Sequence, residues 1–420
     1  MRIVKVIAEP VRAGFFSDDQ AAIRAGAEHD GFGYTGAPVT PGFAAIREPG
    51  EALSVLLLLE DGSVAHGDCA SVQYPGAGGR DPLFDATAAR RDVDEYVAPM
   101  LAGAELGSFR DLAGRVAACR TPTGRLHAAI RYGVTQAVLD AVALARRLTM
   151  AEVVRDEYAT GVDLVPVPMF AQTGDERYAG AERMILKRVD VLPHGLVNNV
   201  DTRLGRRGEL LEAYLRWLVG RIGELRTDDA YAPRLHFDTY GTIGLAFGGD
   251  VEAVAAYLTR LGEIAAPYEL VIEHPIDAGG REPQIETYLR LRDALRRTGS
   301  RVRIAVDEWC NTLEDIAMFA GRGAADVIHV KTPDLGGIDD TIEALLLVRA
   351  AGLMAYCGGT CNETDRSAQV TAHVAMACGA AQVLAKPGMG VDEGLMIVGN
   401  EMARVTAIAA ARRSGGMVLP

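Results

Sequence analysis

The chain has 420 residues, of which 49% are hydrophobic and 24% are charged, a composition typical of globular proteins rather than of disordered ones. A chain of this length usually folds around more than one hydrophobic core, so two domains are expected. The net charge of −13 opposes binding to nucleic acid or to an anionic membrane surface, and neither is expected as a partner.

Residues 1–160 are predicted to form a small α+β domain, because strand-like patterns come first and helix-like patterns follow. Residues 1–16 are strand-like from the start, so no signal peptide is expected. Residues 17–50 are rich in Gly, Pro, Asp and Thr and are predicted to be a long loop, of the kind that can close over a substrate. Two strands at 54–59 and 63–67 flank Asp61-Gly62, a strong hairpin signal, a loop covers 71–79, and helical periodicity covers 85–102, 107–119 and 126–149.

Residues 161–420 are predicted to form a second domain in which strands and helices alternate. Strands are predicted at 165–171, 184–191, 235–237, 270–272, 303–306, 327–330, 353–356 and 381–384, and helices at 208–226, 251–264, 283–298, 313–321 and 339–350. Eight strands at this spacing indicate a (β/α)-type barrel. The eight strand ends are Gln172, His194, Asp238, Glu273, Asp307, Lys331, Thr360 and Lys386.

Four of these strand ends carry three carboxylates and one amine. Asp238, Glu273, Asp307 and Lys331 lie 35, 34 and 24 residues apart in succession, and one strand with its crossover helix takes about 30 residues. Since barrel enzymes keep their active sites at the carboxyl ends of the strands, these four side chains are expected to converge.

Carboxylate oxygens are hard ligands, and Mg²⁺ is the cation that best fits a few carboxylates with water and a substrate oxygen. Zinc would favour imidazole or thiolate ligands, which these three positions lack. A single acid after a strand often only caps the next helix or pairs with a cation. Three in consecutive units favour a metal site.

Lys331 follows one unit further round. A lysine beside a bound cation is expected to have a depressed pKa, which suits a general base; the alternative is that Lys331 only balances the charge of the acids. A divalent cation with a base suits removal of a proton α to a carboxylate, because the cation stabilises the enolate. The enolate can then expel a leaving group from the next carbon.

No apolar run approaches the roughly 18 residues of a membrane span. The six cysteines form no paired framework and no Cys-x-x-Cys motif, which favours reduced thiols in a cytoplasmic protein. Cys357 and Cys361 leave zinc open as an alternative, although no second pair of ligands accompanies them.

Several longer motifs resemble those of the methylaspartate ammonia-lyase family, over nearly the whole chain. In the second domain these are FDTYGTIG (237–244), AVDEWCNT (305–312), VKTPDLGGI (330–338), GGTCNET (358–364) and KPGMG (386–390). In the first they are HDGF (29–32), YTG (34–36), VQY (72–74) and GRDPLF (79–84).

The resemblance implies a modified TIM barrel of the enolase type with an N-terminal α+β capping domain, assembled as a homodimer. It also implies reversible loss of ammonia from (2S,3S)-3-methylaspartate, an amino dicarboxylic acid, to give mesaconate. Mg²⁺ would be required and K⁺ would activate, in a cytoplasmic enzyme of amino-acid degradation and glutamate metabolism.

The resemblance also assigns roles to individual residues. Asp238, Glu273 and Asp307 would bind Mg²⁺, and Lys331 would take the C3 proton of the L-threo substrate. His194 would lie on the opposite face, hold the metal-bound carboxylate and serve as base or acid for the other epimer. The far carboxylate would be bound by Gln172, Thr360 and the backbone N–H of Cys361.

Two positions depart from the family. His329 and Cys357 both stand where the family has Gln; the Gln replaced by His329 touches the metal-bound carboxylate. His329 lies on the same strand face as Lys331. A cationic His329 would lower the pKa of Lys331, or the ring would change which side chain fits at C3. The alternatives are therefore another enolase-superfamily acid dehydratase or epimerase, or a barrel that only binds or regulates.

Overall fold

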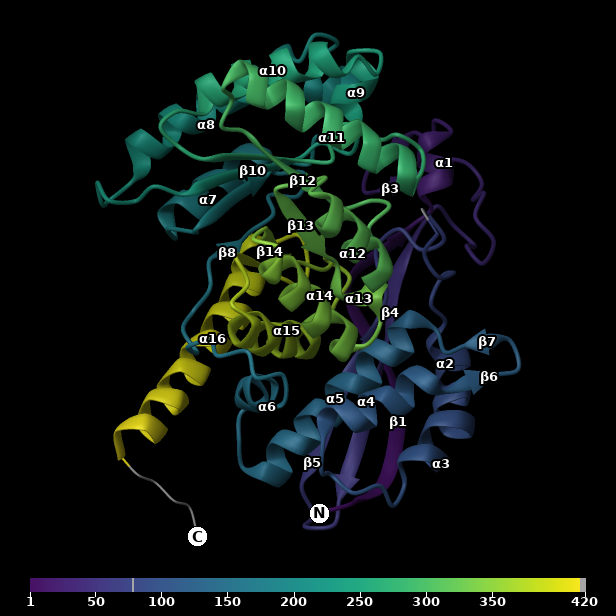
Figure 1. The fold of residues 1–420 in the computed structure, drawn as a ribbon. Coiled ribbons are helices and arrows are strands. Elements are labelled where there is room, and N and C mark those ends of the chain that lie inside the picture. Colours follow the sequence, from purple (N-terminus) through teal and green to yellow (C-terminus); the bar gives the residue numbers. More distant parts are fainter. Residues whose placement is uncertain (78, 416–420) are drawn as a thin grey trace.

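Eight parallel strands close into a barrel in the computed structural model, which describes residues 1–77 and 79–415 (Figure 1). The order around the barrel is β10-β11-β12-β13-β14-β15-β8-β9. The strands are β8 (Met169–Phe170), β9 (Val191–His194), β10 (Arg234–Asp238), β11 (Leu270–Glu273), β12 (Arg303–Val306), β13 (Val327–Val330), β14 (Met354–Cys357) and β15 (Gln382–Leu384). The predicted barrel is confirmed.

Helices separate the barrel strands and agree with the five predicted ones to within two residues. They are α7 (Arg177–Leu186), α8 (Glu209–Leu225), α10 (Val251–Ala265), α11 (Arg281–Thr298), α12 (Leu313–Arg322), α14 (Ile338–Ala350), α15 (Asp365–Cys378) and α16 (Val391–Gly415), with the short α9 (Thr242–Ala246), η2 (Val200–Leu204) and α13 (Thr332–Leu335). The sequence did not predict α15, because this helix is buried nearly all round and shows no apolar stripe.

The strand predicted at 184–191 is wrong. Met184 and Ile185 belong to the buried face of α7, and β9 begins only at Val191. Short apolar runs do not distinguish a strand from a buried helix face. The strand predicted at 165–171 is likewise only two residues long in the structure, yet both strands end where the site needs them.

The N-terminal part contains a three-stranded antiparallel sheet, in the order β1 (Ile3–Asp18), β4 (Arg47–Leu59) and β5 (Val64–Ala70). The predicted hairpin is confirmed, since Leu59 N–H donates to the Ser63 carbonyl at 2.9 Å. Its helices are α2 (Ala86–Asp92), η1 (Val93–Val97), α3 (Ala98–Leu101), α4 (Phe109–Ala118), α5 (Ala128–Arg146) and α6 (Met150–Glu157). The small hairpin β6 (Arg120–Thr121) and β7 (Gly124–Arg125) precedes α5.

The prediction of a long loop at 17–50 is only partly correct. It contains α1 (Gln20–Arg24) and the small hairpin β2 (His29–Asp30) and β3 (Gly33–Tyr34), and strands β1 and β4 extend into its two ends. The Asp19 carboxylate organises the segment. It caps α1 and also accepts from the N–H groups of Val39 and Thr40.

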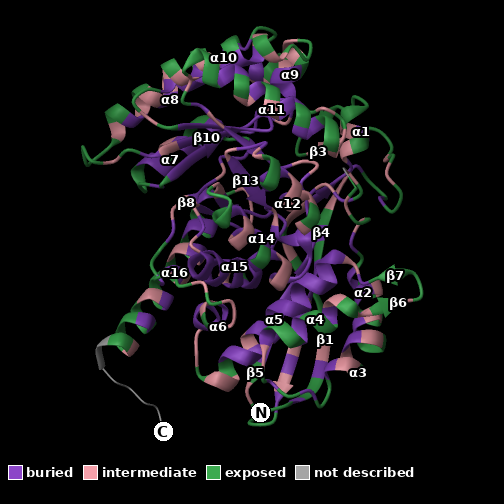
Figure 2. Cartoon of the chain, in the orientation of Figure 1, coloured by how far each residue is buried: buried purple, intermediate pink, exposed green. Residues whose placement is uncertain are grey.

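Helix α5 is the core helix of the N-terminal part and packs on β4 and β5. By length and composition alone α5 could cross a membrane, whereas no segment of that kind was expected from the sequence. However, 83% of its most apolar 18-residue stretch is buried inside the protein. Figure 2 shows this buried helix beside the equally buried α15. It is therefore best explained as a core helix.

The N-terminal part lies against the loops that follow the barrel strands. Gly14 N–H donates to the Glu363 carbonyl at 3.0 Å, and Arg80 reaches Asp334 at 2.8 Å. These contacts place it over the carboxyl ends of β13 and β14. The predicted division at residue 160 falls in the irregular segment between α6 and β8, and stays a prediction.

Candidate active site

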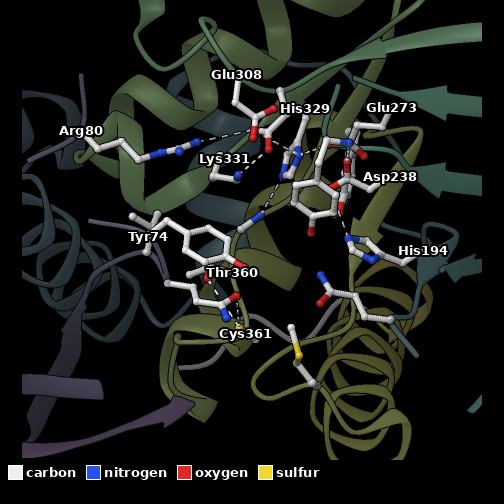
Figure 3. A pocket seen from close by; sticks show the side chains of 18 residues that line it. Tyr74, Arg80, His194, Asp238, Glu273, Glu308, His329, Lys331, Thr360 and Cys361 are labelled. Atoms are coloured by element: carbon white, nitrogen blue, oxygen red, sulfur yellow. Dashed lines mark hydrogen bonds and ion pairs between the residues drawn. The ribbon is translucent and has the colours of Figure 1, made fainter. Parts of the chain in front are cut away.

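One pocket at the carboxyl ends of the barrel strands collects every predicted site residue (Figure 3). The predicted residues that line it are Gln172, His194, Asp238, Glu273, Asp307, His329, Lys331, Thr360 and Cys361. They come from seven different strand ends, which agrees with the convergence expected from their spacing. The contacts of each side chain indicate whether it can bind a cation, transfer a proton or position a substrate.

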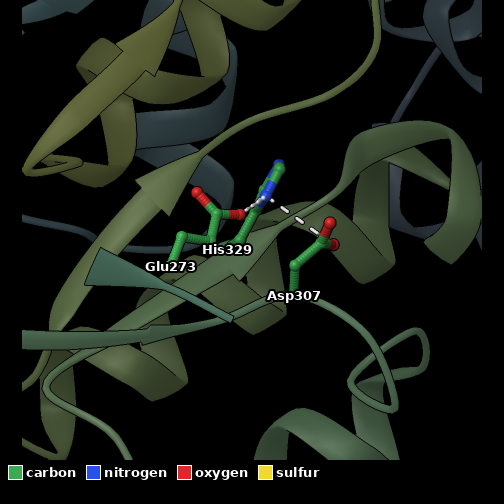
Figure 4. A group of neighbouring side chains, drawn as sticks. All are labelled: Glu273, Asp307 and His329. Carbon is green, nitrogen blue, oxygen red and sulfur yellow. Dashed lines mark hydrogen bonds and ion pairs between the residues drawn. The ribbon is translucent and has the colours of Figure 1, made fainter. Parts of the chain in front are cut away.

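The three carboxylates are almost fully buried, with Asp238, Glu273 and Asp307 exposed by 5%, 1% and 4%. Asp307 Oδ1 has no hydrogen-bond partner among the described residues. Because buried carboxylates are costly without a cation, this donor set fits a hard divalent ion such as Mg²⁺. Among residues 1–77 and 79–415, one group of side chains has the spacing of metal ligands. It consists of Glu273, Asp307 and His329, whose ligand atoms lie within 4.8 Å of one another (Figure 4).

His329 is bound on both ring nitrogens. Gly359 N–H donates to Nε2 at 3.2 Å, so that nitrogen must be unprotonated. The proton is therefore on Nδ1, which lies 2.7 Å from Glu273 Oε1. A protonated Nδ1 donates to Glu273 and has no lone pair for a metal.

Asp238 lies outside that cluster but beside it. It is in register with Glu273 on the neighbouring strand, and its Oδ2 is 3.5 Å from His194 Nε2. Burial raises the pKa of Glu273, yet the electrostatic attraction of the His329 ring, together with hydrogen bonds from His236 and His329, outweighs burial and holds this pKa well below its usual range. Glu273 is thus ionised at neutral pH and available to a cation.

Lys331 faces the same pocket and pairs with Asp307, with 2.5 Å between Nζ and Oδ2. The predicted depression of its pKa applies to a lysine beside a bound cation, and in the protein alone the shift has the opposite sign. Burial lowers the pKa of Lys331, but the Asp307 carboxylate outweighs burial and leaves the pKa above its ordinary value. The expectation assumed a bound cation that would neutralise this carboxylate.

His194 lies across the pocket from Lys331 (Figure 3). It ends β9 with a φ of 66°, a left-handed conformation that costs energy for a non-glycine residue and is often found at functional sites. Its ring contacts Asp238, so it is close to the acidic cluster. Two groups able to move protons thus lie on opposite sides of one cavity.

The loop after β14 supplies Thr360 and Cys361. Gly358 is required there, because an added Cβ would lie 1.9 Å from His329 Nε2. The Cys361 thiol lies 3.5 Å from Gln73 Oε1, and burial raises its pKa to about 12. Burial also raises the pKa of Cys357 to about 12. Neutral thiols of this kind do not favour the zinc alternative.

Residues of the N-terminal part also line the pocket, and strand-end counting missed them. The side chain of Arg80 is only 5% exposed, lies 2.8 Å from Asp334 and approaches Asp307 at 4.0 Å. Gln73 and Tyr74 belong to the loop predicted at 71–79, to which no role in the site was assigned from strand ends. Gln73, Tyr74 and Arg80 belong to the motifs VQY and GRDPLF, so the sequence indicated their importance only through the resemblance to the family. The further missed lining residues Tyr240, Glu308 and Tyr356 come from the barrel.

The fold and the pocket together define a barrel enzyme of the enolase type. The muconate lactonizing enzyme of Pseudomonas fluorescens, solved with muconolactone, shares the fold with a TM-score of 0.60 over 89% of this chain and 84% of that chain, at 19% identity.

The chain belongs to the methylaspartate ammonia-lyase family. The family models described as its N-terminus and C-terminus match residues 1–159 and 161–411. Methylaspartate ammonia-lyase of Clostridium tetanomorphum is 53% identical over 98% of this chain and 100% of its own length. Beta-methylaspartase from the same organism, solved as a Mg complex, is similar over 98% and 100% of the two chains with a TM-score of 0.95. The Citrobacter amalonaticus enzyme containing (2S,3S)-3-methylaspartic acid has the same TM-score and coverage at 48% identity.

Proposed function

We propose that this protein removes ammonia reversibly from (2S,3S)-3-methylaspartate to give mesaconate, with Mg²⁺ as the required cation. The observation that carries the proposal is the convergence of Lys331 with three buried carboxylates in one pocket. Family membership adds the substrate class, because a relative similar over its full length has been solved with this amino acid.

Asp238, Glu273 and Asp307 would hold the cation. Asp307 supplies an oxygen without a hydrogen-bond partner among the described residues, and Glu273 is kept ionised by its two imidazole neighbours. When bound, Mg²⁺ would stabilise the charge that develops on the substrate carboxylate and would weaken the hold of Asp307 on the Lys331 ammonium. K⁺ is proposed as an activator on the resemblance to the family alone.

Lys331 is proposed to take the C3 proton. The electron pair of the C3–H bond moves toward the adjacent carboxylate and gives the enolate. Its return forms the C2–C3 double bond as the C2–N bond of the substrate ammonium breaks, and ammonia leaves with the electron pair of that C2–N bond. His194, on the opposite side of the pocket, is proposed to hold the carboxylate next to C3 and to serve as base or acid for the other epimer. Proton transfer by positioned groups of this kind typically contributes 10²- to 10⁴-fold, roughly.

The remaining pocket residues are proposed to position the substrate. Gln172, Thr360 and the backbone N–H of Cys361 would bind the far carboxylate. His329 would lie beside the carboxylate next to C3, and its Nδ1–H would orient Glu273. Since His329 is larger than Gln and stacks on Tyr356 with 4.2 Å between ring centroids, it also shapes the space around C3.

We also propose a cytoplasmic homodimer that serves amino-acid degradation, in particular of glutamate. The six cysteines are free thiols, which suits a reducing compartment. The dimer and the metabolic role rest on the resemblance to the family.

The test is an assay with 3-methylaspartate, with and without Mg²⁺, that follows both ammonia and the ultraviolet absorbance of the conjugated diacid. Both products, formed only with the cation, support the ammonia-lyase. Water loss or epimerisation without ammonia would instead indicate a dehydratase or epimerase. Tight binding of substrate without turnover would indicate a binding protein.

A further inference from the structure

A second ion pair lies behind the pocket and takes no part in the chemistry described above. Lys386 lies two residues after β15, and Glu363 lies in the loop between β14 and α15. Their charged atoms are 2.8 Å apart, and both residues are fully buried, at 0% exposure. Two charges removed from water at this depth are costly unless each is fully hydrogen-bonded.

Each donor of the Lys386 ammonium has an acceptor. Nζ lies 2.8 Å from Glu363 Oε1, 2.8 Å from the Gly358 carbonyl and 3.1 Å from Thr332 Oγ1. An ammonium group has three N–H donors, so its capacity is used completely. Two of the three acceptors belong to segments that carry proposed site residues.

Glu363 is bound equally closely. Its Oε1 also accepts from the backbone N–H of Thr360 and from Thr332 Oγ1, both at 3.1 Å. Its Oε2 accepts from Tyr132 O–H at 2.7 Å. Tyr132 belongs to α5, the core helix of the N-terminal part, so the same carboxylate joins the two parts of the chain.

Two segments of the proposed site therefore meet at one ion pair. Thr332 directly follows Lys331, the proposed base. Gly358 and Thr360 define the loop that binds the far carboxylate, and its Gly359 N–H fixes His329. Gly359 also has to be glycine, since an added Cβ would lie 2.1 Å from Glu363 Oε1 and 2.4 Å from Lys386 Nζ, and its φ is 145°.

We propose that the Lys386–Glu363 pair is a positioning device that holds Lys331 and the 358–361 loop in one fixed geometry, with Tyr132 joining it to the N-terminal part. The inference rests on the proposed function, because it takes Lys331 and this loop as the base and the carboxylate-binding segment. Neither charged residue is among those that line the pocket, so each acts through the backbone and Thr332.

If the Lys386–Glu363 pair only stabilised the fold, its removal would change stability but not the kinetics of the folded protein. Replacing both members of a buried ion pair with apolar residues of similar size often leaves stability unchanged, whereas removing one partner is strongly destabilising. The double variant Lys386→Met/Glu363→Met therefore separates stability from positioning. It removes the hydrogen bonds to Gly358, Thr360 and Thr332 while keeping the volume filled.

In the folded double variant we expect kcat to fall and KM for 3-methylaspartate to rise, each by about tenfold or more, because small displacements of positioned groups carry penalties of this size. Exchange of the C3 hydrogen with deuterated solvent should slow in parallel with kcat, since the base is displaced. Calorimetry with mesaconate and Mg²⁺ should show weaker binding, and this readout does not depend on turnover.

The matched control is Arg412→Met/Glu152→Met, which removes an ion pair between α16 and α6, outside the pocket. This control should keep kcat, KM and mesaconate affinity. Wild-type kinetics and affinity in the folded Lys386→Met/Glu363→Met variant would overturn the proposal.

If that double variant does not fold, Tyr132→Phe and Thr332→Val each remove one hydroxyl from the network. We expect Tyr132→Phe mainly to raise KM and Thr332→Val mainly to lower kcat, both by severalfold. Unchanged kinetics in both would overturn the proposal. Inactivity of the wild-type chain would refute the proposed function instead, and the mesaconate affinities of the variants would still test the positioning role.

Discussion

Lys331 Nζ and Asp307 Oδ2 lie 2.5 Å apart at the carboxyl end of the barrel, so the proposed base is paired with a proposed metal ligand. A carboxylate at this distance favours the charged ammonium, which cannot accept a proton. A divalent cation on Asp307 would compete for the same negative charge and favour the neutral amine. Metal binding and readiness of the base are therefore expected to be linked.

Replacement of Lys331 by Ala should abolish turnover of the L-threo substrate, because none of the other described lysines lines the pocket. Mg²⁺ binding should persist, since the three carboxylates remain. Steady-state kinetics and calorimetric titration with Mg²⁺ measure the two effects. Near-normal rates in this variant would remove the assignment of Lys331 as the base.

Removal of the cation with a chelator should abolish activity, and added Mg²⁺ should restore it. Glu273→Gln should raise the Mg²⁺ concentration needed for half-maximal rate by about tenfold or more, about 1.4 kcal/mol, because one buried anionic ligand is lost. Glu269→Gln is a suitable control, since Glu269 pairs with Arg234 and Arg303 at the opposite ends of the strands. Equal Mg²⁺ dependence in Glu273→Gln and the wild type would contradict the assigned ligand.

Substitution of His329 by Gln should change the rate or the substrate preference by roughly tenfold or more, about 1.4 kcal/mol in the barrier. The ring donates to Glu273 and stacks on Tyr356, and an amide would retain at most the first contact. A panel of aspartates with different substituents at C3 provides the measurement. An identical kinetic profile across that panel would show that the position is neutral.

Asp339, in the first turn of α14, should make stability depend on pH. Burial, followed by the neighbouring Asp340, raises its pKa to about 6 from about 3.8. The folded state thus disfavours the charged form, and this destabilisation is absent well below pH 4, grows through the window from 4 to 6 and is complete above it. The full shift corresponds to about 3 kcal/mol, of which the favourable place of an acid at a helix N-terminus offsets a part.

Asp339→Asn should therefore raise the free energy of unfolding at pH 7.5 and have a smaller effect at pH 4.5. Urea titrations at the two pH values supply the comparison. A stability change that is the same at both would mean that the carboxyl is not perturbed by folding.

Much of the site could be read from local patterns. Asp238, Glu273, Asp307 and Lys331 each follow a short apolar strand, and in a parallel barrel the ends of successive strands must come together. Spacing in sequence was therefore enough to predict convergence. The strand at 184–191 failed because Met184 and Ile185 fit either a strand or one face of a helix, a choice that packing makes.

Electrostatics were less predictable. The sequence indicated a lysine near acids, but the sign of its pKa shift depends on the distance to Asp307 and on burial. The state of His329 follows from the N–H of Gly359, a residue 30 positions away. Neither the pKa shift of Lys331 nor the position of the proton on His329 can be predicted from the residues next to them in sequence.

The sequence by itself determined the barrel, the acidic cluster with its lysine and the family, because periodicity and strand-end residues are properties of short segments. Only the tertiary structure decided that Arg80 and Gln73 reach the pocket, that His329 donates to Glu273, and that Lys386 and Glu363 form a buried pair behind the loop. These contacts join residues far apart in the chain. Their distances and their burial are fixed only when the whole chain has packed.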